Sequence, residues 1–167
     1  MPGTPGILSR ASSERIPHLE LPGGNGAPLD VGGTLELTFV NDTGHRKFMA
    51  EIDPDLVREA MVNLLSNAMR YTSEGGSVVV RVARDRRNVL LSVSDTGMGI
   101  AKEDIPRVFS RFWRSDASRE REAGGLGVGL SLTKEIVDRH NGTIAVDSEE
   151  GVGTTFTLHL PIVHRKG

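Results

Sequence analysis

The spacing of hydrophobic positions changes several times along the chain, and each spacing predicts a different element. Apolar residues recur every three or four positions over 54–71, which predicts an amphipathic helix that Asp53 caps and Pro54 begins. Two more helices are predicted over 102–112 and 128–140, the second ending at an Asn141-Gly142 cap. Alternating or β-branched runs predict strands over residues 34–40, 46–52, 77–83, 89–94, 143–148 and 154–160.

The order of these elements predicts the fold class. The strands at 77–83 and 89–94, and those at 143–148 and 154–160, are joined by short turns and form hairpins. Helices grouped on one face of a mixed, mostly antiparallel sheet make a two-layer α/β sandwich. We therefore predict an α+β fold, with a polar, glycine-ended mobile loop over 115–127.

The first 33 residues differ from the rest of the chain. They hold five of the eight prolines and seven glycines, with almost no apolar periodicity. Such a segment buries too little apolar surface to offset the entropy lost on ordering. We predict a flexible tail or linker over 1–33 and one domain over 34–167.

Composition excludes several classes of function. Lys+Arg number 20 against 22 Asp+Glu, so the basic surface of a dedicated nucleic-acid binder is not expected. The absence of cysteine excludes disulfides, thiolate zinc sites and a cysteine nucleophile. No apolar run approaches the roughly 20 residues that cross a bilayer. We expect a cytoplasmic domain without direct membrane contact.

Three polar residues share one face of the helix over 54–71. Asn63, Asn67 and Arg70 lie at positions i, i+4 and i+7, away from the apolar stripe. An amide oxygen suits Mg²⁺, which binds few protein groups together with substrate phosphates, and Arg70 could contact those phosphates. The alternative interpretation is a solvated polar face.

Two glycine-rich segments follow. Asp95 ends a strand before Gly97 and Gly99, where a carboxylate can accept from the amine of a purine and glycines let the backbone approach the base. The run 124–130 leads into a helix, where backbone N–H groups favour phosphate, but it lacks the Gly-Lys-Ser/Thr of a P-loop. Taken singly, the first could be an ordinary turn and the second a hinge.

In this order, the segments resemble the nucleotide-binding boxes of Bergerat-type ATPases. Within that superfamily they resemble the catalytic, ATP-binding domain of bacterial two-component sensor histidine kinases. The resemblance extends over about two thirds of the chain. It is carried by five segments, which are similar to the N, G1, F and G2 boxes and the final glycine hairpin: 63–72, 95–100, 108–114, 125–130 and 151–156.

The resemblance implies roles for individual residues. Asn67 would coordinate Mg²⁺ bridging the ATP phosphates, with Asn63 supporting it from the preceding turn. Arg70 stands where the family often has a phosphate-contacting lysine. Tyr71 would stack near the adenine, and Asp95 would accept a hydrogen bond from its amine.

The remaining implied residues belong to the glycine boxes, the lid and the last hairpin. Residues 115–125 would form the ATP lid, and Arg111 or Arg114 would reach the γ-phosphate when it closes. Val128 departs from the leucine that is usual in the G2 box. Nucleotide contacts are implied for Gly97, Gly99, Ile100, Gly125, Leu126, Gly127, Val128, Gly129, Leu130 and Thr154.

The phosphoacceptor box of the family, a histidine followed by an acidic residue and Leu-Arg-Thr-Pro, is matched by none of the five histidines. The resemblance therefore implies transfer of the γ-phosphoryl of MgATP to a histidine on a separate dimerisation domain, in the same parent chain or on a partner. That domain would serve a response regulator, in a parent anchored in the inner membrane. We expect the isolated domain to be monomeric.

The residue at position 63 predicts that hydrolysis is negligible. In the hydrolytic relatives a glutamate one turn before the metal-binding asparagine orients the attacking water, and Asn63 cannot act as a general base. Two alternatives stay open: a Bergerat-fold regulatory module that binds nucleotide without productive transfer, and a serine kinase of the anti-sigma-factor type.

Overall fold

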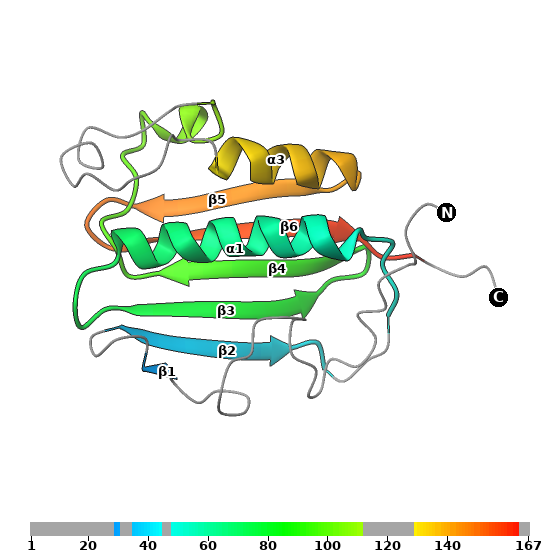
Figure 1. Ribbon diagram of the computed structural model, residues 1–167, viewed down its shortest axis with the longest axis horizontal. Coiled ribbons are helices and arrows are strands. Elements are labelled where there is room, and N and C mark those ends of the chain that lie inside the picture. The colour runs from blue at the N-terminus through cyan, green and yellow to red at the C-terminus, as the bar shows by residue number, and fades with distance from the viewer. Residues whose placement is uncertain (1–28, 31–34, 45–47, 112–128, 164–167) are drawn as a thin grey trace.

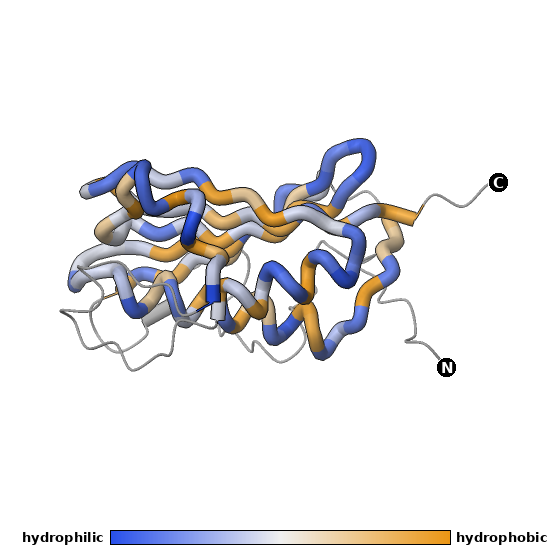
Figure 2. The backbone as a smooth tube through the Cα atoms, turned by 90° about the horizontal axis from the view of Figure 1, so that it is seen from above, coloured by the Kyte–Doolittle hydropathy of each residue, from blue (hydrophilic) through white to orange (hydrophobic). Residues whose placement is uncertain are grey.

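A computed structural model describes residues 29–30, 35–44, 48–111 and 129–163. In these residues six strands form one sheet in the order β1-β2-β3-β4-β6-β5, and α-helices lie against one face of it (Figure 1, Figure 2). The two-layer α+β sandwich predicted from the sequence is confirmed. The elements are β1 (Leu29–Asp30), β2 (Glu36–Asp42), α1 (Pro54–Tyr71), β3 (Ser77–Arg84), β4 (Asn88–Asp95), the 3₁₀ turn η1 (Ile105–Arg107), α3 (Gly129–Arg139), β5 (Thr143–Glu149) and β6 (Gly153–Pro161).

The sheet is mixed, as predicted. β2 and β3 are parallel and α1 connects them, while the other neighbouring strands are antiparallel. A short turn joins β3 to β4, where the Asp85 carboxylate accepts from the N–H groups of Arg87 and Asn88, both at 2.7 Å. These two bonds hold the pKa of the exposed Asp85 carboxyl below its usual range. β6 lies between β4 and β5, so β6 is an inner strand of the sheet and β5 forms its edge.

The hydrophobic core lies between the sheet and the two helices. In β4 and β6 every second residue is buried, because successive side chains of a strand point to opposite faces. The inward positions of the strands meet the apolar stripe of α1 and one side of α3. The buried core residues of these elements are Val57, Ala60, Met61, Leu64 and Ala68 of α1, Val78 and Val80 of β3, Val89, Leu91 and Val93 of β4, Ile136 and Val137 of α3, and Phe156, Leu158 and Leu160 of β6.

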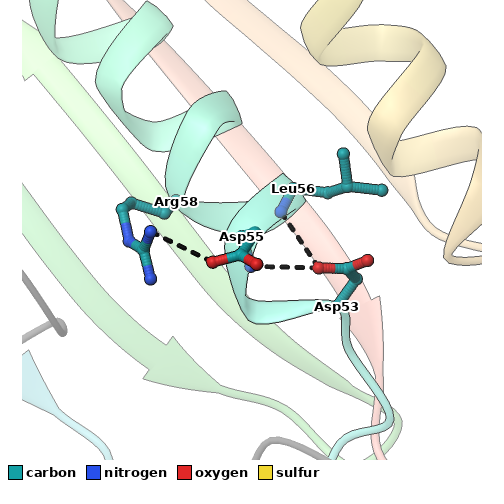
Figure 3. Close-up of polar contacts among 4 residues, drawn as sticks. All are labelled: Asp53, Asp55, Leu56 and Arg58. Carbon is teal, nitrogen blue, oxygen red and sulfur yellow. Dashed lines mark hydrogen bonds and ion pairs between the residues drawn. The ribbon is translucent and has the colours of Figure 1, made fainter. Parts of the chain in front are cut away.

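The start of α1 is fixed by a side-chain cap. The Asp53 carboxylate accepts from the N–H groups of Asp55 at 3.0 Å and Leu56 at 3.3 Å, which satisfies two donors that a helix leaves unpaired (Figure 3). Arg58 forms an ion pair with the Asp55 carboxylate one turn further on, at 3.1 Å (Figure 3). The predicted cap and helix start are confirmed.

A histidine joins this start of α1 to the end of α3. The Asp53 N–H donates to His140 Nε2 at 2.9 Å, and His140 Nδ1 donates to the carbonyl of Ile136 at 2.7 Å. Because Nε2 accepts, the imidazole is neutral with its proton on Nδ1. Asn141 follows with φ 56°, so the left-handed cap predicted after α3 is confirmed.

The strand predicted over 46–52 is wrong in its described part. Residues 48–52 form one isolated bridge, between Ala50 and Ile162, and Val163 N–H donates to the Met49 carbonyl at 2.7 Å. The hydrophobic positions are nevertheless buried, with Phe48 5% and Ala50 0% exposed. Among the described residues, the backbone of this segment pairs only with the residues just after β6, which are too few for a ladder.

The α-helix predicted over 102–112 is also wrong for residues 102–111. The chain there makes consecutive i→i+3 hydrogen bonds, including Arg107 N–H to the Asp104 carbonyl at 2.8 Å and Ser110 N–H to the Arg107 carbonyl at 2.9 Å. Pro106 has no N–H to donate to an i−4 carbonyl, which disfavours a continuing α-helix. Phe109 packs on the core edge-to-face with Phe156, at 6.1 Å between ring centroids.

Two other expectations are touched by the structure. β1 pairs with β2, with Leu29 opposite Leu37, inside the segment predicted as a tail. The rest of 1–33 lies outside the described residues, so the boundary at 33 stays a prediction. The loop predicted over 115–127 also lies outside them and stays a prediction. In the part of the chain that is described, no helix has the length and apolar character needed to cross a membrane.

We expect His140→Ala to lower the free energy of unfolding by about 1–2 kcal/mol, because it removes the hydrogen bond that joins the start of α1 to the end of α3 and the bond that holds the ring on Ile136. Urea unfolding followed by circular dichroism measures this change. The matched control is Arg139→Ala, which removes an exposed ion pair to Glu135 in the same turn and should cost less than about 0.5 kcal/mol. Equal losses in the two variants would contradict the role given to His140.

Candidate functional site

The polar face of α1 carries the first group of predicted site residues. Asn63 and Asn67 are half-buried and Arg70 is exposed, while the neighbouring apolar stripe packs on the sheet. Asn63 Nδ2 donates to the carbonyl of Gly129 at 3.4 Å, so it connects α1 to the first residue of α3. Thr133 donates to the same carbonyl at 2.8 Å. The structure therefore brings Asn63 and Gly129 together, although they lie 66 positions apart.

Asn67 differs from Asn63 in having no hydrogen-bond partner among the described residues. Its amide oxygen is a neutral, hard ligand of the kind that Mg²⁺ accepts together with phosphate oxygens and water. The described residues hold no cluster of three or more His, Asp or Glu side chains suited to a metal ion. A metal at this site would therefore depend on Asn67 and on oxygens supplied by a substrate.

The second group of predicted site residues begins with Asp95, the last residue of β4. Alternation along β4 places its side chain on the face where Val89, Leu91 and Val93 are buried, so it points to the helix side of the sheet. Its Oδ1 accepts from the Gly97 N–H at 2.9 Å. Burial raises the pKa of the Asp95 carboxyl above the usual 3.8, while hydrogen bonds from the N–H groups of Gly97 and Thr154 act in the opposite direction.

The loop after Asp95, residues 97–100, is held by the end of α1. Met98 N–H donates to the Tyr71 carbonyl at 3.3 Å. A side chain at Gly97 would collide with the same Tyr71 carbonyl, so only glycine lets the loop lie this close to the helix. The backbone contact brings Tyr71 and Gly97, two predicted nucleotide-binding residues, to one place.

The β5–β6 turn holds the loop from its other side. Gly151 N–H donates to the Met98 carbonyl at 2.8 Å, and Ile100 N–H donates to Ser148 Oγ at 2.8 Å. Gly99 has φ 69°, and a Cβ there would overlap the carbonyl of Glu149. The ends of α1 and β4 and the β5–β6 turn lie together at the left end of the sheet in Figure 1. Loop 97–100 is thus clamped between two segments distant in sequence.

Thr154 lies beside Asp95 on the same face of the sheet. The two residues are directly paired across β4 and β6, and Thr154 is 6% exposed. Gly153 precedes it with φ 155°, and a Cβ there would overlap the Asp95 carbonyl. Thr154, one of the predicted nucleotide contacts, therefore lies directly beside the last residue of β4.

Other predicted residues are placed less fully. Leu130 and Ile100 are half-buried and pack against the core. Arg111 is exposed, and the structure does not join it to the residues above. Gly125, Leu126, Gly127, Val128 and Arg114 lie outside the described residues, so their roles stay predictions.

Sequence reasoning missed Ser148. Its hydroxyl accepts from the Ile100 N–H and donates to the carbonyl of Gly153 at 3.1 Å, so it contacts both the clamped loop and β6. A signal was present in β5, where Ile144, Val146 and Ser148 occupy the inward positions. A serine that interrupts an apolar inward series indicates a specific hydrogen bond.

We expect Gly99→Ala to lower the free energy of unfolding by about 2–3 kcal/mol, because a positive φ and a backbone overlap act together. The matched control is Gly151→Ala, which has φ 81° but open space around its Cβ and should cost about 1 kcal/mol. Denaturant unfolding of both variants tests the clamp. The clamp would be wrong if Gly99→Ala cost no more than Gly151→Ala.

Comparison with known families agrees with this geometry. The family described as "Histidine kinase-, DNA gyrase B-, and HSP90-like ATPase" matches residues 52–164, more than half of the chain. The sensor histidine kinase WalK of Bacillus subtilis is 42% identical over 125 residues, which cover 74% of this chain and 20% of WalK. The sensor histidine kinase CusS of Escherichia coli is 45% identical over 127 residues, which cover 76% of this chain and 25% of CusS. The chain thus spans about a quarter or less of these two relatives.

A solved structure shows the same relation. The mycobacterial sensor histidine kinase MprB superposes with a TM-score of 0.67 at 29% identity, over 77% of this chain and 84% of that one. The resemblance found in the sequence boxes is confirmed by these comparisons, and ATP binding follows from the family. The chain belongs to the histidine kinase-, DNA gyrase B- and HSP90-like ATPase family, as a catalytic ATP-binding domain of the bacterial sensor histidine kinase type.

Proposed function

We propose that this domain transfers the γ-phosphoryl of MgATP to a histidine on a separate dimerisation and phosphoacceptor domain. The phosphoryl group would pass from that histidine to a response regulator, on the cytoplasmic side of a membrane-anchored parent. The support is the arrangement of Asn63 and Asn67 on α1, where Asn63 contacts the start of α3, together with the pairing of Asp95 and Thr154 on the sheet. The family membership supports the same conclusion.

The adenine would bind at the clamped loop. Asp95 presents a carboxylate that can accept from the exocyclic amine, and the glycines of loop 97–100 keep side chains away from the base. Tyr71 lies beside this loop and Ile100 ends it; both are half-buried, which suits contact with a flat apolar ring. A related solved structure supports a nucleotide here: full-length ShkA, 25% identical with a TM-score of 0.66, is described as a complex with AMPPNP.

The phosphates would lie along the polar face of α1. Asn67 would hold Mg²⁺ through its amide oxygen, which accepts no hydrogen bond from the described residues, and the metal would neutralise charge on the phosphates. Arg70 is exposed one turn beyond and would pair with a phosphate oxygen. The other predicted phosphate contacts come from Arg111 or Arg114, Gly125, Gly127 and the first turn of α3.

The observation that carries transfer rather than hydrolysis is the environment of Asn63. Its amide nitrogen donates to the Gly129 carbonyl, so the position that would orient an attacking water holds a neutral amide already engaged with α3. In the proposed reaction an imidazole nitrogen of the acceptor bonds to the γ-phosphorus, the bond to the bridging oxygen breaks, and ADP leaves. The proton of the attacking imidazole passes to solvent.

We expect Asp95→Asn to weaken ATP binding at least about tenfold in calorimetric titration, because a half-buried carboxylate acceptor is lost. The control is Asp147→Asn, which alters an exposed carboxylate of β5 and should leave affinity unchanged. Equal affinity of Asp95→Asn and the control would contradict the placement of the base.

The raised pKa of Asp95 also sets a pH dependence. The folded chain holds this proton more tightly than the unfolded chain, so the stability contributed by the site falls as the pH rises through the range between 3.8 and the raised pKa. ATP binding has the opposite dependence, because the carboxylate form accepts from the amine. We expect wild-type affinity to fall as the pH approaches the raised pKa from above, and Asp95→Asn to lack this dependence.

A phosphoacceptor domain supplied in trans with γ-labelled ATP tests the transfer itself. We expect acid-labile, base-stable label on that domain and almost no free phosphate released by the chain alone. Acid-stable label would indicate a serine kinase. Steady phosphate release would contradict the role given to Asn63, and ATP binding without any transfer would favour a regulatory module.

A further inference from the structure

The Ser148 hydroxyl lies at the junction of three parts of the site. Its oxygen is 2.8 Å from the Ile100 N–H of the clamped loop, 3.1 Å from the Gly153 carbonyl and 2.8 Å from Thr154 Oγ1. Ser148 is half-buried and lies one residue before the end of β5, on the same face of the strand as Ile144 and Val146. No other hydroxyl among the described residues joins loop 97–100 to β6 in this way.

The three contacts fix the direction of each hydrogen bond. A hydroxyl has one proton to donate and can accept two bonds. The Gly153 carbonyl can only accept, so the Ser148 proton is directed to it, and the Ile100 N–H can only donate. The remaining contact must then run from the Thr154 hydroxyl to Ser148 Oγ.

This direction decides what Thr154 can offer to a ligand. With its proton directed to Ser148, Thr154 Oγ1 presents lone pairs only. Asp95, its direct partner across the sheet, is also an acceptor when ionised. Two neighbouring acceptors favour a base with an amine at this point and disfavour a base with a carbonyl oxygen there, which would place lone pairs against lone pairs.

We propose that Ser148 is a positioning residue that sets the base preference of the nucleotide site. Its hydroxyl holds Thr154 as an acceptor and ties Ile100 to β6, so that a 6-amino purine is preferred over a 6-oxo purine. The inference rests on the proposed ATP site and adds the cause of its selectivity. Without Ser148, the Thr154 hydroxyl is free to rotate and donate to a 6-oxo group.

The test compares the dissociation constants of ATP and inosine triphosphate, with Mg²⁺, for the full chain and its variants. Ser148→Ala should weaken ATP about fivefold and reduce the preference for ATP over inosine triphosphate by a similar factor. Ser148→Thr keeps the hydroxyl and should keep the preference. A loss of folding would weaken both nucleotides equally, so the ratio is the readout that a purely structural role leaves unchanged.

The matched control is Ser94→Ala. Ser94 Oγ lies 2.8 Å from Thr155 Oγ1, the same hydroxyl pair at the same distance, but on the face of the sheet turned away from the helices. This variant should change neither dissociation constant. Thr154→Val supplies the second arm, because Ser148→Ala added to it should change the nucleotide ratio no further if Ser148 acts through Thr154.

The outcomes separate this inference from the proposed function. An unchanged nucleotide ratio in Ser148→Ala, with normal ATP binding by the wild-type chain, overturns the role of Ser148 alone. A ratio that falls in Ser148→Ala and equally in Ser94→Ala also overturns it. Failure of the wild-type chain to bind ATP contradicts the proposed function, and this inference with it.

Discussion

The site depends on the clamp that holds residues 97–100 between the end of α1 and the β5–β6 turn. Backbone groups of Tyr71 and Gly151 bind Met98 from opposite sides, and the Ser148 hydroxyl binds Ile100. These contacts join three segments far apart in sequence, so the loop has its shape only when the whole sheet is assembled. Asp95 is half-buried at the base of this clamp, and this burial raises the pKa of its carboxyl. Folding and the proposed nucleotide site therefore rest on the same few hydrogen bonds.

Much of the fold could be predicted because burial imposes a period on the sequence. The stripe on α1 and the alternation in β4 and β6 gave elements that agree with the structure to within about two residues. The failures have local causes. Residues 48–52 are as apolar as a strand, but among the described residues their backbone pairs only with Ile162 and Val163. Pro106 divides a helical pattern into 3₁₀ turns. Periodicity reports which side chains are buried, whereas a partner strand or a missing N–H decides the backbone structure.

The candidate site could be predicted where its chemistry requires a particular type of residue. It could not be predicted where a residue depends on a contact with a distant element. Asp95, Asn63 and Asn67 could be proposed from their polarity and spacing. The engagement of Asn63 with Gly129, and of Ser148 with Ile100 and Thr154, depends on contacts between elements that no spacing along the chain encodes. The glycines could be predicted in part. The glycine-rich segments suggested that the backbone approaches another group closely, but only the fold shows that Gly99 lies against Glu149 and Gly153 against Asp95.

The central claim is that the base of a bound nucleotide lies against loop 97–100 and the start of β6, on the helix side of the sheet. The most direct measurement is the change in backbone amide chemical shifts when AMPPNP and Mg²⁺ are added to the labelled chain. The account predicts large changes at Gly97, Gly99, Ile100 and Thr154, with little change at Ser92, which β4 directs to the opposite face. Saturable shifts that spare loop 97–100 and fall on that opposite face would contradict it.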